Sequence, residues 1–194
     1  MNVAWRQLLT GLRGWRRPQR PVAAAARMLA SWDARTRLEA RGPLLWLAQQ
    51  LSEARRVAQA AVDDPDEPLT GLLDALDVAV PPRVQDVGGP DGAEQLAAAV
   101  RQARREAAHL ASAAPRSARR TLMRLAGDLA EACGTFDRVC NDVLGADLRA
   151  ADLSHVYLGG IRWDDATQWP AQWADRISAA SACTDGSFQV RDDW

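Results

Sequence analysis

Residues 116–144 read RSARRTLMRLAGDLAEACGTFDRVCNDVL, and their apolar side chains recur every seven positions. The repeat comprises Ala118, Leu122, Leu125, Leu129, Ala132, Phe136, Val139 and Val143. A heptad pattern of this kind puts one continuous apolar seam on a helix, and neighbouring helices must cover that seam. We therefore predict a long helix over residues 116–144 and a helical bundle around it.

Five stretches before this segment also show helical spacing of apolar residues. The spacing predicts helices over residues 2–15, 22–39, 43–62, 69–80 and 93–114. We expect Gly42-Pro43 to end the second of these helices and Arg41 to lie on a flank of the third. Pro115 separates the fifth helix from 116–144, so the two are predicted to form an antiparallel hairpin.

One segment between these helices has no apolar periodicity. Residues 81–92 contain three Pro and three Gly. Such a composition is typical of a loop. We expect a flexible loop over residues 81–92.

The spacing of large apolar residues changes at Gly145, from a period of seven to a period of five. The units are ADLRA (146–150), ADLSH (151–155), VYLGG (156–160) and IRWDD (161–165). Their central residues are Leu148, Leu153, Leu158 and Trp163. The first two units share a small residue, then Asp, then Leu, whereas the last two keep only the bulky centre.

These units resemble the pentapeptide-repeat family, whose chains wind a right-handed, four-sided β-helix. The resemblance covers residues 146–165, about one coil, and the helical region before it is not recognised. The following Thr167 and Trp169-Pro170 resemble the tail of many actinobacterial members, in which Phe188 and Val190 would fold back on the coil. A lone coil cannot bury both of its ends against other coils. We therefore expect it to cap the bundle.

The predicted fold is mainly α, a bundle of five or six helices capped by this coil and by a short helix. We assign residues 1–144 to the bundle. Residues 145–194 are assigned to the coil, to a Trp-rich helix that has Thr167 or Trp169 as its N-terminal cap and ends near Ala182, and to the tail. This second unit is expected to pack on the first.

Composition and charge exclude several classes of protein. Hydrophobic residues make up 47% and charged residues 25% of the 194 residues, which excludes a wholly disordered chain. No segment is long and apolar enough for a spanning helix, and arginines interrupt the N-terminal segment where a signal peptide would be apolar. Three cysteines form no disulfide framework, so a cytoplasmic location is expected.

The net charge of −1 conceals blocks of opposite sign. The blocks are +8 for residues 1–60, −8 for 61–100, +4 for 101–140 and −5 for 141–194. Alternating blocks favour pairing within the fold or between subunits.

The residues that usually carry chemistry form no convincing catalytic, cofactor or metal motif. His109 and His155 have too few ligand-type neighbours for a metal site, and Cys133 and Cys140 fit the packing of a helix face. The glycines at 88–92 lack the Lys of a phosphate loop. We expect no catalytic residue, no cofactor and no metal, and hence no enzyme.

The strongest candidate surface is the N-terminal segment, where tryptophans alternate with arginines. It comprises Trp5, Arg6, Arg13, Trp15, Arg16, Arg17 and Arg20. These residues would bind another protein or an anionic partner, or the tryptophans pack on the bundle while the arginines face water. The sequence favours a non-enzymatic adaptor or regulatory subunit that binds another protein or itself. The alternative is a peripheral binder of nucleic acid or of an anionic membrane.

Overall fold

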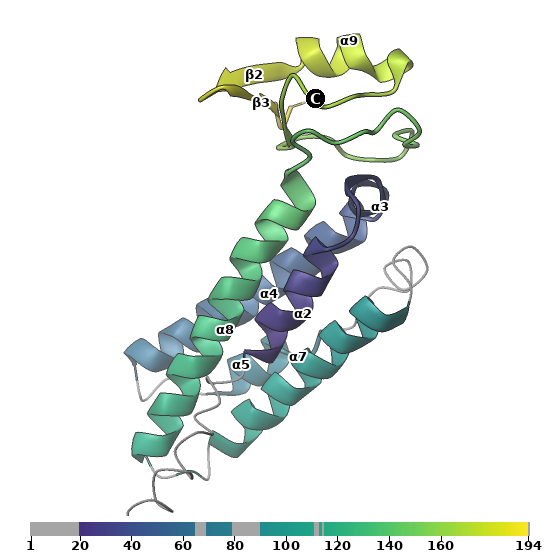
Figure 1. Cartoon of the computed structure of the whole chain (residues 1–194). Helices are drawn as coiled ribbons and strands as arrows, with labels where there is room; N and C mark the ends of the chain where they lie inside the picture. Colours follow the sequence, from purple (N-terminus) through teal and green to yellow (C-terminus); the bar gives the residue numbers. More distant parts are fainter. Residues whose placement is uncertain (1–19, 65–68, 79–89, 111–112, 114, 194) are drawn as a thin grey trace, which may run out of the picture.

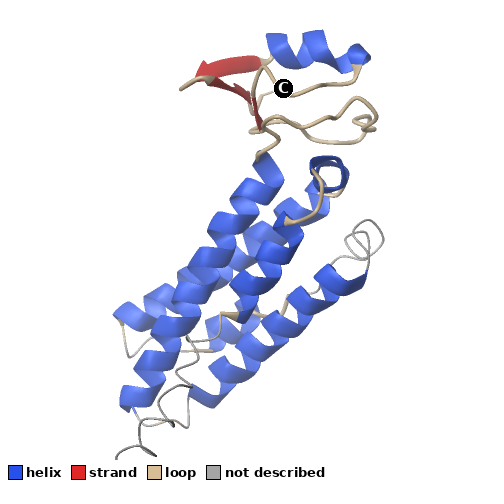
Figure 2. Cartoon of the chain, viewed as in Figure 1, coloured by secondary structure: helices blue, strands red, loops and turns tan. Residues whose placement is uncertain are grey.

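The computed structural model describes residues 20–64, 69–78, 90–110, 113 and 115–193. Most of the described chain is helical, with a small sheet near the C-terminus (Figure 2). The helices are α2 (Pro21–Ala30), α3 (Ala34–Glu39), α4 (Arg41–Asp63), α5 (Thr70–Ala75), α7 (Pro90–Leu110), α8 (Pro115–Asn141) and α9 (Ala171–Ala179). The strands are β1 (Arg162–Trp163), β2 (Ser181–Thr184) and β3 (Ser187–Val190). The predicted bundle is confirmed.

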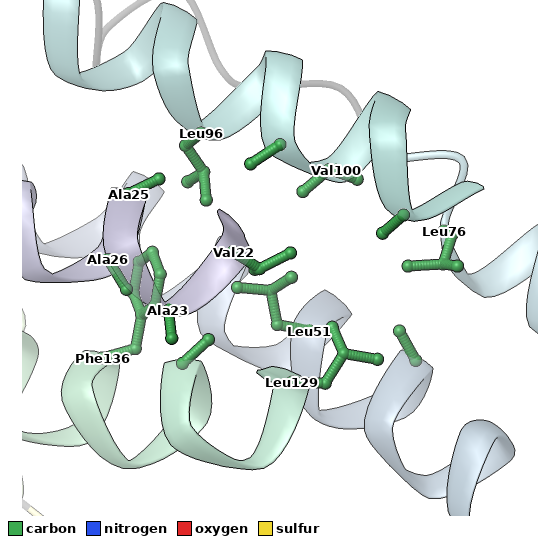
Figure 3. Close-up of a cluster of buried hydrophobic side chains, with 14 of the residues drawn as sticks. Val22, Ala23, Ala25, Ala26, Leu51, Leu76, Leu96, Val100, Leu129 and Phe136 are labelled. Atoms are coloured by element: carbon green, nitrogen blue, oxygen red, sulfur yellow. The ribbon is translucent and has the colours of Figure 1, made fainter. Parts of the chain in front are cut away.

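The long helix α8 runs along one side of the bundle, with α4 and α2 packed along it (Figure 1). Its seam residues Leu125, Leu129 and Phe136 are buried, as the heptad pattern predicts. They pack against small residues of α2 and against leucines of α4 in one continuous core (Figure 3). The alanine-rich face of α2 lets its backbone approach both α8 and α7.

Helices α7 and α8 run antiparallel, as predicted (Figure 1), although only part of the length of each contacts the other. Helix α2 packs extensively against both α7 and α8, and α7 and α8 contact each other much less. The side chains that α2 buries between these helices are small: Val22, Ala23, Ala25 and Ala26. Small side chains let the α2 backbone approach both neighbours.

The predicted single helix over 22–39 is wrong, because this segment forms two helices. Helix α2 ends at Ala30, and Asp33 begins α3 by accepting a hydrogen bond from the Thr36 backbone N–H at 2.9 Å and from its hydroxyl at 2.6 Å. An Asp cap of this kind satisfies N–H groups that a new helix leaves free. Leu29 and Trp32 keep a helical spacing across this break, so the pattern of apolar residues in the sequence does not indicate it.

Gly42-Pro43 does not end a helix but lies in the first turn of α4. A proline is tolerated there because the first N–H groups of a helix have no intrahelical partner. Other boundaries differ at helix ends: α5 is shorter than the predicted 69–80, and α8 ends at Asn141 instead of Leu144. Helix α7 begins at Pro90, so residues 90–92 of the predicted loop are helical. The rest of that loop up to residue 89, and the predicted helix over 2–15, lie outside the described residues.

Residues 143–161 form one coil with a β-turn in every five residues. The turns are closed by backbone hydrogen bonds from Ala146 to Val143, Ala151 to Leu148, Val156 to Leu153 and Ile161 to Leu158, at 2.9–3.2 Å. After twenty residues the chain meets its own start, since Asp142 pairs with Arg162 in a parallel bridge. The Leu148, Leu153, Leu158 and Trp163 side chains are all buried inside.

Three aspartates spaced five residues apart, one before the first unit and one at the second position of each of the first two units, stabilise these turns. Asp142, Asp147 and Asp152 each accept a hydrogen bond from the backbone N–H two residues later, at 3.0–3.3 Å. Such Asx turns hold the backbone in a tight bend. The fivefold spacing of aspartates therefore has a local cause in the turn itself.

Both ends of the coil are covered by other parts of this chain. Leu38 of α3 covers the end that faces the bundle, and Ile177 of α9 belongs to the same buried cluster. Strand β3 pairs antiparallel with β1 and β2, and Phe188 stacks on Trp163 with ring centroids 4.5 Å apart. The predicted return of Phe188 and Val190 onto the coil is confirmed.

The last helix is shorter than predicted. It begins after Pro170, without a side-chain cap from Thr167 or Trp169, and ends at Ala179. Ser181 then begins β2, so Ala182 is extended and not helical. The Thr167 hydroxyl instead donates to the Val143 carbonyl at 3.1 Å and ties the tail to the coil.

Candidate functional site

Arg41, at the start of α4, joins the bundle to the coil. Its guanidinium donates to the Cys140 carbonyl at 2.7 Å and to Asn141 Oδ1 at 2.8 Å, both at the end of α8. It also donates to the Tyr157 and Gly159 carbonyls of the coil, the latter at 2.7 Å. One side chain thus holds three segments that are far apart in the sequence.

The sequence prediction that Arg41 lies on an exposed flank is wrong, since only 2% of the residue is exposed. Burial lowers the pKa of its guanidinium, and in the described part of the chain no carboxylate forms an ion pair with it. Backbone carbonyls at the negative end of α8 take the place of that carboxylate. The Tyr157 ring adds a cation–π contact, with the guanidinium carbon 5.5 Å from its centroid.

A groove of about 600 Å³ opens beside this junction, between the α3–α4 corner and one side of the coil. Its size lies within the range of ligand-binding pockets. The bundle contributes Arg35, Leu38, Glu39, Ala40, Gly42 and Pro43, and the coil contributes Asp152, His155, Val156 and Tyr157.

The groove lining combines apolar side chains with charged and polar ones, which we call its rim: Arg35, Glu39, Asp152 and His155. Pro43 and Val156 provide aliphatic surface, and Tyr157 is 51% exposed. The Tyr157 hydroxyl donates to the Asp192 carbonyl at 3.0 Å, which fixes the ring in place. A rigid aromatic surface with a polar rim is typical of sites that bind other molecules.

The rim is more acidic than basic. Arg35 and Glu39 form an ion pair at 2.8 Å, one turn apart on α3. The Asp152 side chain accepts from Ser154 N–H, and this bond lowers the pKa of its carboxyl. Asp152 therefore carries a negative charge at neutral pH that is not neutralised by the Arg35–Glu39 pair.

The structure describes one residue of the predicted N-terminal surface, Arg20. It is exposed and its Nη1 lies 2.6 Å from Glu131 Oε2. Arg27 pairs with the other oxygen of the same carboxylate. Trp5, Arg6, Arg13, Trp15, Arg16 and Arg17 lie outside the described residues.

No family model, curated protein or solved structure matches this chain. The site must therefore be interpreted from its own geometry. Among the described residues, no helix has both the length and the apolar character needed to cross a bilayer. Within the same residues, no three His, Cys, Asp or Glu side chains gather where they could hold a metal ion.

Histidine and cysteine, two residue types that often react in enzymes, lie differently with respect to the groove. His155 and Asp152 lie on the groove rim, and no cysteine is among the lining residues. Cys140 is buried beneath Arg41, and burial raises the pKa of its thiol to about 12. A thiol with that pKa is not a nucleophile at neutral pH.

Sequence reasoning missed Arg41, Tyr157 and the groove. Tyr157 is the single tyrosine of the chain and occupies the position where the first two units have Asp. This departure from the repeat was a usable signal, because a unit without its Asx turn must be held by other contacts. No local pattern marks Arg41, since its partners are about 100 residues away.

Proposed function

We propose that this chain is a non-enzymatic protein-interaction subunit that acts by binding a short segment of another protein. The groove between the α3–α4 corner and the coil is the proposed binding surface. The observation that carries the proposal is the half-exposed Tyr157 ring, fixed by hydrogen bonding beside a groove of about 600 Å³. Fixed aromatic side chains contribute binding energy with little loss of conformational freedom.

The rim indicates the chemistry of the partner. Glu39 and Asp152 outnumber Arg35, so the groove favours a segment with an apolar anchor and a neighbouring Lys or Arg. A segment of this type would place its anchor against Tyr157 and Val156 and its cation near Asp152. The cytoplasmic location expected from the sequence, and membership of the pentapeptide-repeat family, are parts of the same proposal.

Selection of random peptides displayed on phage against the full chain tests the proposal. We expect the selected peptides to share an apolar residue next to a basic residue. Their affinity, measured by fluorescence polarisation, should fall about tenfold or more in Tyr157→Ala, because loss of a central aromatic anchor typically costs about 2 kcal/mol. Trp46→Ala is the matched control, since Trp46 is an exposed aromatic of α4 that does not line the groove.

A second variant separates binding from folding. Asp152→Asn removes the rim charge that would attract the cation of the partner but keeps the oxygen that accepts from Ser154 N–H, so it should weaken binding without changing the unfolding temperature. Peptides that bind Tyr157→Ala, Asp152→Asn and the unchanged chain equally would contradict the proposed site.

The alternative function is peripheral binding of a nucleic acid or an anionic membrane. Arg116, Arg119 and Arg120 are exposed at the start of α8, and no carboxylate in the described part of the chain pairs with them. They would add to the charge of the N-terminal arginines. Affinity for anionic vesicles or duplex DNA that falls steeply with salt, and falls again in Arg13→Ala, Arg16→Ala, Arg17→Ala, would favour this function.

A further inference from the structure

A second cavity, of about 300 Å³, lies between α2, α3 and the end of α8. It is lined by Arg27, Ala30, Arg37, Thr135, Arg138, Val139, Asp142 and Leu144. The residues come from α2, α3, α8 and the segment that follows α8, and the break between α2 and α3 brings Arg37 to α8. This cavity is separate from the Tyr157 groove and shares no lining residue with it.

The cavity has an excess of positive charge. Arg27, Arg37 and Arg138 line it, against a single carboxylate, Asp142. Arg27 shares the carboxylate of Glu131 with Arg20, so one acid serves two cations. Within the described residues, Arg37 and Arg138 form no ion pair with an acid.

Arg37 also has an unused donor. Its Nη1 donates to the Val139 carbonyl at 3.3 Å, but its Nε is buried and has no hydrogen-bond partner among the described residues. Buried donors in proteins nearly always have a partner, so an unpaired one needs an explanation. The unpaired guanidinium adds to the excess positive charge beside the cavity, and an anion bound in the cavity would offset that charge.

Guanidinium groups that converge in a cavity fit the oxygens of a phosphate or carboxylate, because their N–H groups form a planar fork. One wall of the cavity is apolar, from Ala30, Val139 and the half-exposed Leu144. We propose that the cavity binds a small phosphate monoester, with its phosphate held by Arg37 and Arg138 and its organic group against Leu144. Binding here does not depend on the function proposed for the groove.

The competing explanation is that Arg37 and Arg138 only stabilise the negative end of α8, as cations near a helix C-terminus do. The two explanations differ in what they predict for ligand binding. Stabilisation of the helix end needs no ligand and predicts no saturable binding of phosphate compounds.

Isothermal titration calorimetry of the full chain at constant ionic strength, with phenyl phosphate and with inorganic phosphate, tests the proposal. We expect one saturable site for phenyl phosphate and weaker binding of inorganic phosphate. Absence of saturable binding of phenyl phosphate would overturn the proposal. Equal affinity for both ligands would overturn the assignment to a monoester.

Three variants and a control locate the site. Arg138→Ala should weaken binding about tenfold, because a hydrogen-bonded charge is lost. Arg37→Lys should also weaken binding, because Lys keeps the positive charge but lacks the planar fork of N–H donors. Asp142→Asn keeps the oxygen that accepts from Leu144 N–H, and it should strengthen binding several-fold, a gain that misfolding cannot produce. Arg119→Ala removes an exposed charge of α8 outside the cavity and should change nothing. Equal weakening in Arg119→Ala and Arg138→Ala would show non-specific attraction and overturn the proposal.

Discussion

Asp128 shows how one buried side chain can begin a helix that is distant in sequence. It lies on α8 and is 1% exposed, and its two oxygens accept from the Val22 and Ala23 N–H groups at 3.1 and 2.9 Å. Helix α2 has no side-chain cap of its own at Arg20. The residue that caps α2 therefore lies more than 100 positions further along the chain.

We predict that Asp128→Ala lowers the free energy of unfolding by about 2–4 kcal/mol, because two buried N–H groups lose their acceptors. Urea denaturation followed by circular dichroism measures this change. Arg119→Ala, an exposed change on the same helix, is the control and should stay within about 0.5 kcal/mol of the unchanged chain. A loss below about 1 kcal/mol for Asp128→Ala would contradict the capping role.

The same residue predicts a pH effect. Burial raises the pKa of the Asp128 carboxyl, and the hydrogen bonds from Ala23 and Val22 oppose this shift only in part. The folded state therefore holds the proton more tightly than the unfolded state, and the contribution of Asp128 to stability falls as pH rises from about 3.8 through the raised pKa. Asp128→Asn cannot titrate. We expect its stability relative to the unchanged chain to increase over that pH range in parallel urea titrations, and a constant difference would contradict the shift.

The cysteines are predicted to differ in reactivity. The pKa of Cys140 is raised from 9.0 to about 12, which lowers its thiolate fraction about a thousandfold at neutral pH, whereas Cys183 is exposed on β2. Iodoacetamide labelling with mass spectrometry should modify Cys183 in minutes and leave Cys140 intact. In guanidinium chloride both should react. Rapid labelling of Cys140 in the folded chain would show that the Arg41 junction opens frequently.

At the scale of elements, glycine destabilises the long helix α8 but is favoured in a turn of the coil. Gly134 lies in α8, where an added Cβ would meet no atom within 4 Å. Gly160 ends a turn of the coil with φ of +80°, and an added Cβ would lie 3.4 Å from Asp192 Oδ1. A helix interior favours Ala, whereas a positive φ favours Gly.

We therefore predict opposite signs for one substitution at two sites. Gly134→Ala should raise the unfolding free energy by about 0.5–1 kcal/mol, and Gly160→Ala should lower it by about 1–2 kcal/mol. Thermal unfolding of both variants side by side measures the difference. A stabilising Gly160→Ala would mean that the turn does not have the backbone conformation described above.

At the scale of the whole molecule, Arg41 couples two hydrophobic cores. One core belongs to the bundle, and the other joins the coil, α9 and the sheet to Leu38 of α3. Loss of the Arg41 guanidinium would leave the Cys140 and Gly159 carbonyls and Asn141 Oδ1 without this donor. Such buried, unpaired groups are costly.

We predict that Arg41→Ala lowers the unfolding free energy by about 3–5 kcal/mol and accelerates amide exchange in the coil more than in α2 and α7. Hydrogen–deuterium exchange with mass spectrometry resolves the two regions. Arg35→Ala removes a nearby exposed arginine and is the matched control. Uniform acceleration over the whole chain would show that the two cores unfold as one unit and would contradict the coupling role.

Periodicity in the sequence by itself determined the bundle, the heptad seam of α8 and the fivefold turns after Gly145. These features are local: a helix or a β-turn repeats its contacts at fixed spacing, so the apolar residues and the aspartates of the turns appear at fixed spacing too. Only the tertiary structure decided the cap of α2 by Asp128, the position of α2 between α7 and α8, the burial of Arg41 and both cavities. Each of these joins residues from helices or turns far apart in the chain, and no spacing rule connects an arginine at position 41 with carbonyls at 140 and 159.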